Sequence, residues 1–119
     1  MKSEEIHMLL DFSKLDETSI YKLISNTVTP RPIAWISTEH NGIVNLAPFS
    51  YFIPLSSEPP MLIVSIGKKE DESPKDTLAN FLAGSKVTIN FVHKELRAIM
   101  SQSATSLDYT QSEFEHFGI

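Results

Sequence analysis

The stretch "IAWISTEHNGIVNLAPFSYF", residues 33–52, carries the strongest local structural signal in the chain. Residues 33–38 are β-prone, and the chain is β-prone again from Ile43 onward. Between them lies the pair Asn41-Gly42, which favours the positive φ angles of a tight hairpin turn. The stretch therefore predicts a β-hairpin.

The second arm of this hairpin contains Pro48, which has no backbone donor, together with the polar Asn45 and Ser50. A proline is expected at a sheet edge, at a bulge or where a ligand replaces a ladder partner, and the residues alone do not choose among these. Strict alternation would put Phe49 and Tyr51 on one face, with Ser50 and Phe52 on the other. The aromatic group of this region is more typical of a core than of a cofactor site: Trp35, Phe49, Tyr51, Phe52.

The rest of the chain predicts two further strands and several helices. Strands are expected over Met61 to Ile66 and Lys86 to Val92, where Ile63 and Phe91 are candidate core residues. Helices are expected over about residues 14–28 and 93–104, and a third from an N-cap at Ser73 through Pro74 to a terminating Gly84. The last residues add at most one more turn. The fold class is therefore mainly β, with four strands and flanking helices.

Length and composition indicate one ordinary globular domain over residues 1–119, with 41% hydrophobic and 21% charged residues. The net charge is −5 and no Lys/Arg cluster forms a basic face, which argues against binding to nucleic acid or to an anionic membrane surface. Cysteine is absent, so disulfides, thiolate metal sites and cysteine nucleophiles are excluded. The N-terminus does not resemble a secretory signal, and the apolar runs are far shorter than the ~20 residues of a membrane span. A cytoplasmic protein is expected.

Motifs for common catalytic and nucleotide sites are missing. The sequence contains no G-x-G-x-x-G, P-loop, H-E-x-x-H or G-x-S-x-G pattern. The four histidines are scattered, and the acidic run over residues 70–72 suits a solvated turn better than a metal site. No catalytic residue and no metal ligand is predicted.

Two segments are candidate anion sites. Lys75-Asp76-Thr77 lies at a predicted helix start, where backbone N–H groups, a lysine and a hydroxyl favour a phosphate, although plain helix capping explains the same residues. Arg31 lies between Pro30 and Pro32, so its guanidinium extends from a stiff segment that suits a fixed bidentate contact. An ordinary surface arginine is the alternative.

Taken together, seven ordered stretches resemble the flavin reductase-like, FMN-binding split-barrel family, which includes flavoredoxin. They extend over about Tyr21 to Gly118 and read "TPRPIAWIST", "NG", "NLAPFSYF", "EPPML", "KDTLANF", "VTINFV" and "SEFEHFG". The resemblance implies an FMN-binding split β-barrel that works as a homodimer. Members of this family usually run well beyond this length, so the chain corresponds to the N-terminal part, and its barrel is expected to be either incomplete or completed across a dimer.

The resemblance also implies FMN contacts for three segments and one further residue. The first segment approaches the flavin and its phosphate, and its members are Thr29, Pro30, Arg31, Pro32 and Ala34. The second runs along the ring and ribityl chain and consists of Ala47, Pro48, Phe49 and Ser50. The third, Lys75, Asp76 and Thr77, resembles the phosphate-binding loop, and Asn90 lies where a family strand passes near the cofactor.

These implications give two functional hypotheses. The first is an FMN protein that reduces flavin with NAD(P)H or passes electrons from a redox protein, as a flavoredoxin does. Such chemistry needs orientation of the cofactor rather than a nucleophile or metal, which agrees with the missing catalytic motifs. The second is a truncated, non-catalytic dimeric module without a complete flavin pocket. A different phosphate-bearing cofactor is a third possibility for the same residues.

Overall fold

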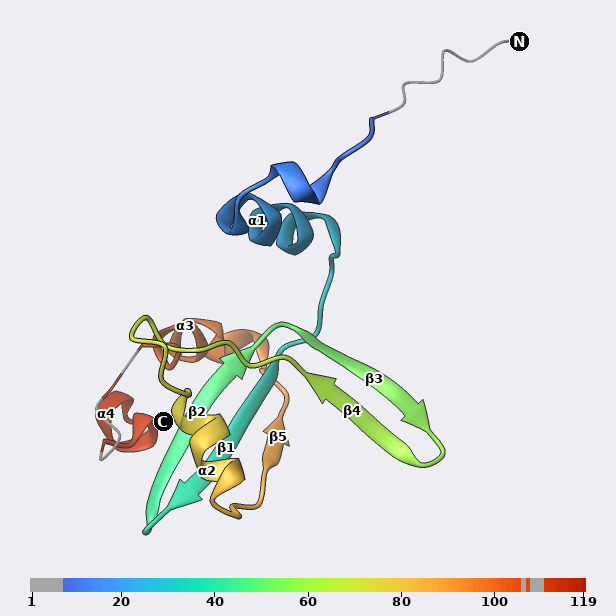
Figure 1. The fold of residues 1–119 in the computed structure, drawn as a ribbon. Helices are drawn as coiled ribbons and strands as arrows, with labels where there is room; N and C mark the ends of the chain where they lie inside the picture. Colours follow the sequence, from blue (N-terminus) through green and yellow to red (C-terminus); the bar gives the residue numbers. More distant parts are fainter. Residues whose placement is uncertain (1–7, 106, 108–110) are drawn as a thin grey trace. The chain divides into compact units, whose positions relative to one another are not determined.

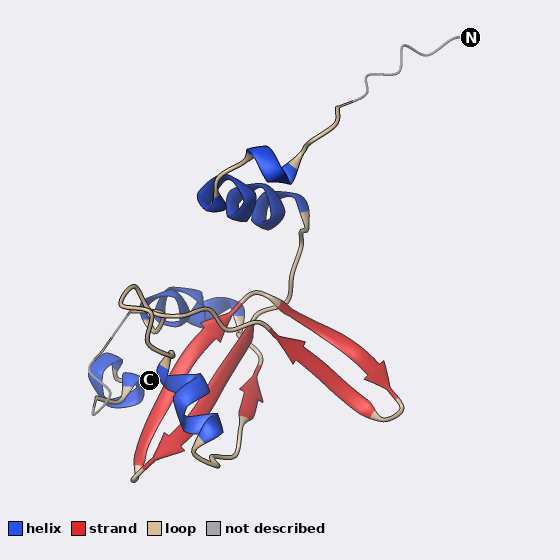
Figure 2. Cartoon of the chain, viewed as in Figure 1, coloured by secondary structure: helices blue, strands red, loops and turns tan. Residues whose placement is uncertain are grey.

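The computed structural model describes residues 8–105, 107 and 111–119 (Figures 1 and 2). Contacts between residues divide the chain into two compact units, Met1–Pro30 and Arg31–Ile119. Each unit is described separately below. None of the described helices is both long and apolar enough to cross a membrane.

The first unit contains a short 3-10 helix, η1 (Phe12–Lys14), and the helix α1 (Glu17–Thr27). Asp16 caps α1 by accepting a hydrogen bond from the backbone N–H of Ser19 at 2.7 Å. Hydrogen bonds from Ser19 hold the pKa of this exposed carboxyl below its ordinary value. The helix predicted for this region is thus confirmed.

The second unit is built around a three-stranded antiparallel sheet with the order β2-β1-β5. Strands β1 (Ala34–His40) and β2 (Ile43–Phe49) form the predicted hairpin. Its turn has Asn41 at φ 50° and Gly42 at φ 80°, the left-handed conformations that an Asn-Gly pair favours. The predicted fourth strand is shorter than expected, since β5 spans only Thr88–Asn90.

A second, two-stranded sheet pairs β3 (Phe52–Ser57) with β4 (Pro60–Val64). The described chain therefore has five strands where the sequence predicted four, because the β-prone run after Ile43 breaks at residues 50–51. This break also makes the predicted alternation wrong. Phe49 and Phe52 lie in the same buried cluster rather than on opposite faces.

The core cluster of the second unit comes from the strand residues Ala34, Ile36, Phe49 and Phe52. Trp35 is buried as well, so three of the four aromatic residues expected in the core are confirmed there. Tyr51 is only half-buried.

The expectation that Ile63 and Phe91 belong to the core is wrong, because their side chains are 44% and 79% exposed. Strands β3 and β4 pair only with each other, which leaves Ile63 uncovered within the described chain. Phe91 lies one residue beyond the end of β5.

Helices flank the sheet of the second unit. The helix α2 (Asp76–Leu82) packs against β1 and β2, and α4 (Glu113–Phe117) packs against β2. Between them in sequence lie η2 (Lys94–Leu96) and α3 (Arg97–Gln102), which together form the helix expected over residues 93–104.

The helix α2 begins two residues later than predicted, at Asp76 instead of Pro74. Lys75 occupies the N-cap position, while Ser73 hydrogen-bonds to Asp71 and Pro74 forms an isolated β-bridge with Lys68. The predicted end is confirmed, since Gly84 follows the helix at φ 97°.

Candidate functional site

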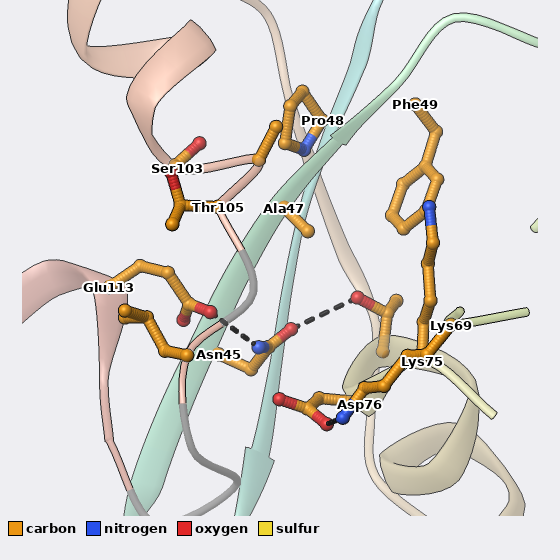
Figure 3. A pocket seen from close by; sticks show the side chains of 13 residues that line it. Asn45, Ala47, Pro48, Phe49, Lys69, Lys75, Asp76, Ser103, Thr105 and Glu113 are labelled. Carbon is orange, nitrogen blue, oxygen red and sulfur yellow. Dashed lines mark hydrogen bonds and ion pairs between the residues drawn. The ribbon is translucent and has the colours of Figure 1, made fainter. Parts of the chain in front are cut away.

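A half-open cavity of about 70 Å³ lies between β2, the start of α2 and the residues around α4 (Figure 3). Two segments that the sequence analysis selected separately line it together. Ala47, Pro48 and Phe49 come from β2. Lys75, Asp76 and Thr77 come from the first turn of α2 and its cap. The fold thus brings the ring segment and the phosphate segment of the resemblance to one place.

The other predicted contact residues do not line this cavity. Thr29 and Pro30 belong to the first unit. In the second unit, Ala34 is fully buried in the core, and the Asn90 side chain donates a hydrogen bond to the carbonyl oxygen of Trp35 at 3.0 Å. Three further predicted residues are also outside the cavity lining: Arg31, Pro32 and Ser50.

Arg31 contacts the break between β2 and β3. Its Nε donates to the carbonyl oxygen of Ser50 at 3.0 Å, and its guanidinium carbon lies 5.1 Å from the centre of the Tyr51 ring. Both contacts are with the two residues that separate β2 from β3. Arg31 therefore fixes the corner between the two sheets of this unit.

Lysine side chains supply positive charge at the cavity. The Lys69 Nζ lies 2.7 Å from the Asp76 carboxylate in a half-buried ion pair. Lys75 is exposed, and its Nζ lies 5.7 Å from the centre of the Phe49 ring. Lys69 was not among the predicted site residues, because it precedes the acidic turn in sequence and only the fold brings it to Asp76.

Sequence reasoning also missed the polar network on the inner side of the cavity. The Glu113 carboxylate accepts from Asn45 Nδ2 at 2.9 Å and from the backbone N–H of Leu46 at 2.9 Å. The oxygen of the Asn45 amide accepts from the Thr77 hydroxyl at 3.0 Å. Three of these residues, Asn45, Thr77 and Glu113, line the cavity, and all three are buried. The hydroxyl proton of Thr77 is therefore already donated to Asn45 within the protein.

Burial raises the pKa of the Glu113 carboxyl above its ordinary value, and the negative charge of Asp76 acts in the same direction. The hydrogen bond from the Leu46 N–H opposes this shift, because it stabilises the ionised form. Burial is the largest of these effects.

The same contacts explain the proline in β2. Successive residues of an antiparallel strand direct their backbone groups to opposite sides, and the Leu46 N–H points away from β1 because it bonds Glu113. Val44 points the same way, since its carbonyl accepts from the Ser112 hydroxyl at 2.6 Å. Pro48 lies two residues after Leu46, so its backbone nitrogen faces the same side of the strand. Its missing N–H donor therefore falls on the outer edge of the described sheet. Of the alternatives left open above, the edge position is confirmed.

A second wall of the cavity is held by Ser103, which is 1% exposed. Its hydroxyl accepts from the Trp35 indole N–H at 2.9 Å and donates to the Met100 carbonyl at 2.6 Å. The remaining lining residues that the sequence did not indicate are Ala104, Thr105 and Leu107.

The site has the chemistry of a binding surface rather than of a nucleophilic centre. It combines a strand edge, an aromatic ring and lysine side chains, which suit a planar ligand with an anionic group. Among residues 8–105, 107 and 111–119, no cluster of three or more His, Asp or Glu side chains could hold a metal ion.

Comparison with known proteins identifies a family. The model of the flavin reductase like domain matches residues 26–119. An uncharacterized protein from Deinococcus radiodurans is 37% identical over 118 residues, which is 95% of this chain and 52% of that protein. One from Aquifex aeolicus is 37% identical over 105 residues, 87% of this chain and 54% of the relative. The chain thus spans about half the length of these curated relatives.

Solved structures agree with the family match. Component B of nitrilotriacetate monooxygenase from Bacillus cereus superposes with a TM-score of 0.88 at 26% identity, covering 97% of this chain and 57% of that one. The 2-nitrobenzoate 2-nitroreductase of Pseudomonas fluorescens gives a TM-score of 0.80 at 27% identity, covering 93% and 52%. A split-barrel protein from Shewanella frigidimarina shares the fold, with a TM-score of 0.72. The two sheets and flanking helices described above are therefore part of a split barrel, which the described residues do not close.

Proposed function

The chain belongs to the family of the flavin reductase like domain, and on that basis we propose that it binds FMN at the cavity between β2 and α2. Its role is NAD(P)H-dependent flavin reduction or flavoredoxin-type electron transfer. One observation carries this proposal beyond family membership. Ala47, Pro48 and Phe49 line the same cavity as Lys75, Asp76 and Thr77, although residues 50–74 separate the two segments in sequence.

The lysines of the cavity are the proposed anchor for the FMN phosphate. Lys75 is exposed at the rim, and Lys69 is held nearby by Asp76. Since α2 is only seven residues long, the proposal relies on these side-chain charges and not on a helix dipole. The backbone of Thr77 is a further candidate donor, whereas its hydroxyl proton is engaged with Asn45.

The flavin ring is proposed to lie along the outer edge of β2, next to Ala47 and Pro48. A cavity of about 70 Å³ is small for this purpose, because pockets that enclose drug-sized ligands measure roughly 300–1,000 Å³. We propose that a second protein surface completes the pocket and that a homodimer supplies it. The remaining predicted contacts stay part of the proposal: Thr29, Pro30, Arg31, Pro32, Ala34, Ser50 and Asn90.

Bound FMN would supply the hydride and electron chemistry of such a protein. The residues of this chain would hold the phosphate, orient the ring and limit its contact with water. Two similar structures are named as a monooxygenase component and a nitroreductase, which supports an oxidoreductase role. NAD(P)H or a redox protein is the proposed donor, and the reducing cytoplasm is the proposed compartment.

A non-catalytic dimeric module is the second candidate function. It is favoured by the small cavity and by the internal use of the Thr77 hydroxyl. The two candidates differ in whether the purified protein takes up FMN at all.

Purification followed by a visible absorption spectrum tests the proposal. The protein should carry flavin colour or bind added FMN, and Lys75→Ala should bind it at least about tenfold more weakly, the loss expected for one charge-assisted contact. Lys94→Ala, at another exposed lysine, is the matched control and should bind like the wild type. A colourless protein that does not bind added FMN would favour the non-catalytic module.

Mixing the FMN-loaded protein with NADH or NADPH without air separates the two redox roles. Bleaching of the flavin absorbance is the result expected for a reductase. Its absence with both nucleotides would leave a redox protein as the donor.

A further inference from the structure

Glu113 is a buried carboxylate on a very short helix. The helix α4 has five residues, yet the Glu113 side chain is only 3% exposed. Burying a charge costs free energy unless hydrogen bonds satisfy it. Both carboxylate oxygens have such a bond, one from the Asn45 amide and one from the Leu46 backbone. The Glu113 carboxylate therefore links α4 to β2 through two hydrogen bonds.

The pattern of donors requires the carboxylate in particular. Asn45 Nδ2 and the Leu46 N–H both donate, so the partner must offer two acceptors. A glutamine at position 113 would offer one acceptor, and its amide N–H groups would face one of the two donors. Substitution by the amide would thus leave a buried donor unpaired at almost the same side-chain volume.

Asn45 transmits this contact to the other wall of the cavity. Its Nδ2 donates to Glu113 (Figure 3). This bond fixes the amide so that Oδ1 accepts from the Thr77 hydroxyl. Thr77 lies in the first turn of α2, between Asp76 and the rest of the helix. One chain of hydrogen bonds therefore connects α4, β2 and α2. The charged side chains that line the same cavity are Lys69, Lys75 and Asp76.

We propose that Glu113 is a positioning residue for the flavin site. It holds the outer edge of β2 against α4 and, through Asn45 and Thr77, sets the distance between the Ala47–Phe49 wall and the start of α2. This inference rests on the function proposed above. According to this inference, the shape of the cavity depends on Glu113, which is 67 positions away from Leu46 in sequence.

The test compares Glu113→Gln with Glu115→Gln, a matched change at an exposed glutamate two residues along the same helix. FMN affinity is measured by quenching of flavin fluorescence, and ring orientation by visible circular dichroism of bound FMN. Glu113→Gln should weaken FMN binding roughly tenfold, the loss expected for one hydrogen bond to a charged group, and should change the dichroism of the bound flavin. Glu115→Gln should match the wild type in both.

Thr77→Val gives a second, independent variant because it removes the hydroxyl at the far end of the hydrogen-bond chain. If Thr77 acts through Asn45 and Glu113, the variant should weaken binding of riboflavin as well as of FMN. The double variant that combines Glu113→Gln with Thr77→Val should bind FMN no more weakly than the weaker-binding of the two single variants. A loss confined to FMN would mean direct phosphate contact and would overturn the positioning role of this chain.

The outcomes separate the inference from the proposed function. Wild-type protein that binds no FMN overturns the proposed function, and the inference with it. Wild-type protein that binds FMN, with unchanged affinity and dichroism in Glu113→Gln, overturns only the inference. If Glu113→Gln does not fold, unchanged affinity for both flavins in Thr77→Val has the same meaning.

Discussion

Arg31 shows how one side chain can decide where a strand ends. Its guanidinium group contacts the corner at Ser50 and Tyr51. The sequence indicated a guanidinium extended from a stiff segment, and it left open whether Arg31 binds an anion or is an ordinary surface arginine. Within the described chain the contact reaches a carbonyl oxygen and an aromatic ring.

Replacing Arg31 by Ala should lower the free energy of unfolding by about 1–2 kcal/mol, because a hydrogen bond from a charged donor and a cation–π contact are both lost. Urea unfolding followed by circular dichroism measures the change. Arg97→Ala, at an exposed arginine of α3, is the control and should change stability by less than about 0.5 kcal/mol. Equal effects of the two substitutions would show that the corner does not depend on Arg31.

Glu113 should make stability depend on pH. Its pKa is raised above the ordinary value of 4.5, so the folded state binds its proton more tightly than the unfolded state does. The stabilisation that comes from this tighter proton binding is therefore fully present below about pH 4.5 and is lost as pH rises through the folded pKa, separately from the hydrogen bonds that the carboxylate accepts from Asn45 and Leu46. The exposed carboxyls of Asp11, Asp16 and Asp71 have lowered pKa values and titrate below this window.

Unfolding free energies measured from about pH 4.5 to about pH 7.5 test this linkage. Between the ordinary pKa and the raised one, the wild type should lose stability relative to Glu113→Gln as pH rises. Parallel curves for the two proteins would mean that Glu113 titrates alike in the folded and unfolded states.

At the scale of elements, the β1–β2 turn is a direct test of the hairpin. Gly42→Ala should cost about 1 kcal/mol, because alanine is strained at φ 80°. Gly67→Ala is a matched control: an added methyl group meets no atom within 4 Å at either position, but Gly67 has no positive φ. Gly67→Ala should leave stability unchanged or raise it by less than about 1 kcal/mol. Thermal unfolding compares the two, and equal losses would contradict the account of the turn.

The elements that the sequence predicted correctly depend on local signals. The turn at Asn41-Gly42 and the end of α2 at Gly84 follow from residues that adopt positive φ readily. The break between β2 and β3 was not predicted, and the contact made there by Arg31 joins residues 19 positions apart, which no local signal reveals. The start of α2 was misplaced for a different reason, since Pro74 forms a β-bridge with the nearby Lys68, which capping rules do not consider.

At the scale of the whole molecule, half of the candidate site was predictable. Lys75–Thr77 was found from its position at a predicted helix start and Pro48 from its place in a strand, and the resemblance to a family assigned flavin contacts to both segments. Asn45 and Glu113 were present in the stretches that resemble the family but had no assigned role, because the contact between them joins residues 68 positions apart. Only the fold reveals that pairing.

The β3–β4 hairpin supports the proposed dimer, because its apolar side chains are exposed in the described chain; they include Ile53, Leu55, Met61, Leu62 and Ile63. Sedimentation equilibrium should give a dimer for the wild type and a monomer for Leu55→Lys, which adds a charge to this surface. Leu82→Lys, at an exposed leucine of α2, is the control and should remain dimeric. A wild-type monomer would remove the dimer from the proposed function.

The central claim is that the cavity between β2 and α2 holds a flavin through its phosphate and its ring. Fluorescence titration of the purified protein with FMN and with riboflavin tests this most directly. FMN should bind, and riboflavin should bind at least about tenfold more weakly, because it lacks the phosphate that Lys75 and Lys69 are proposed to hold. Equal affinities would contradict the phosphate anchor, and no binding of either flavin would contradict the claim as a whole.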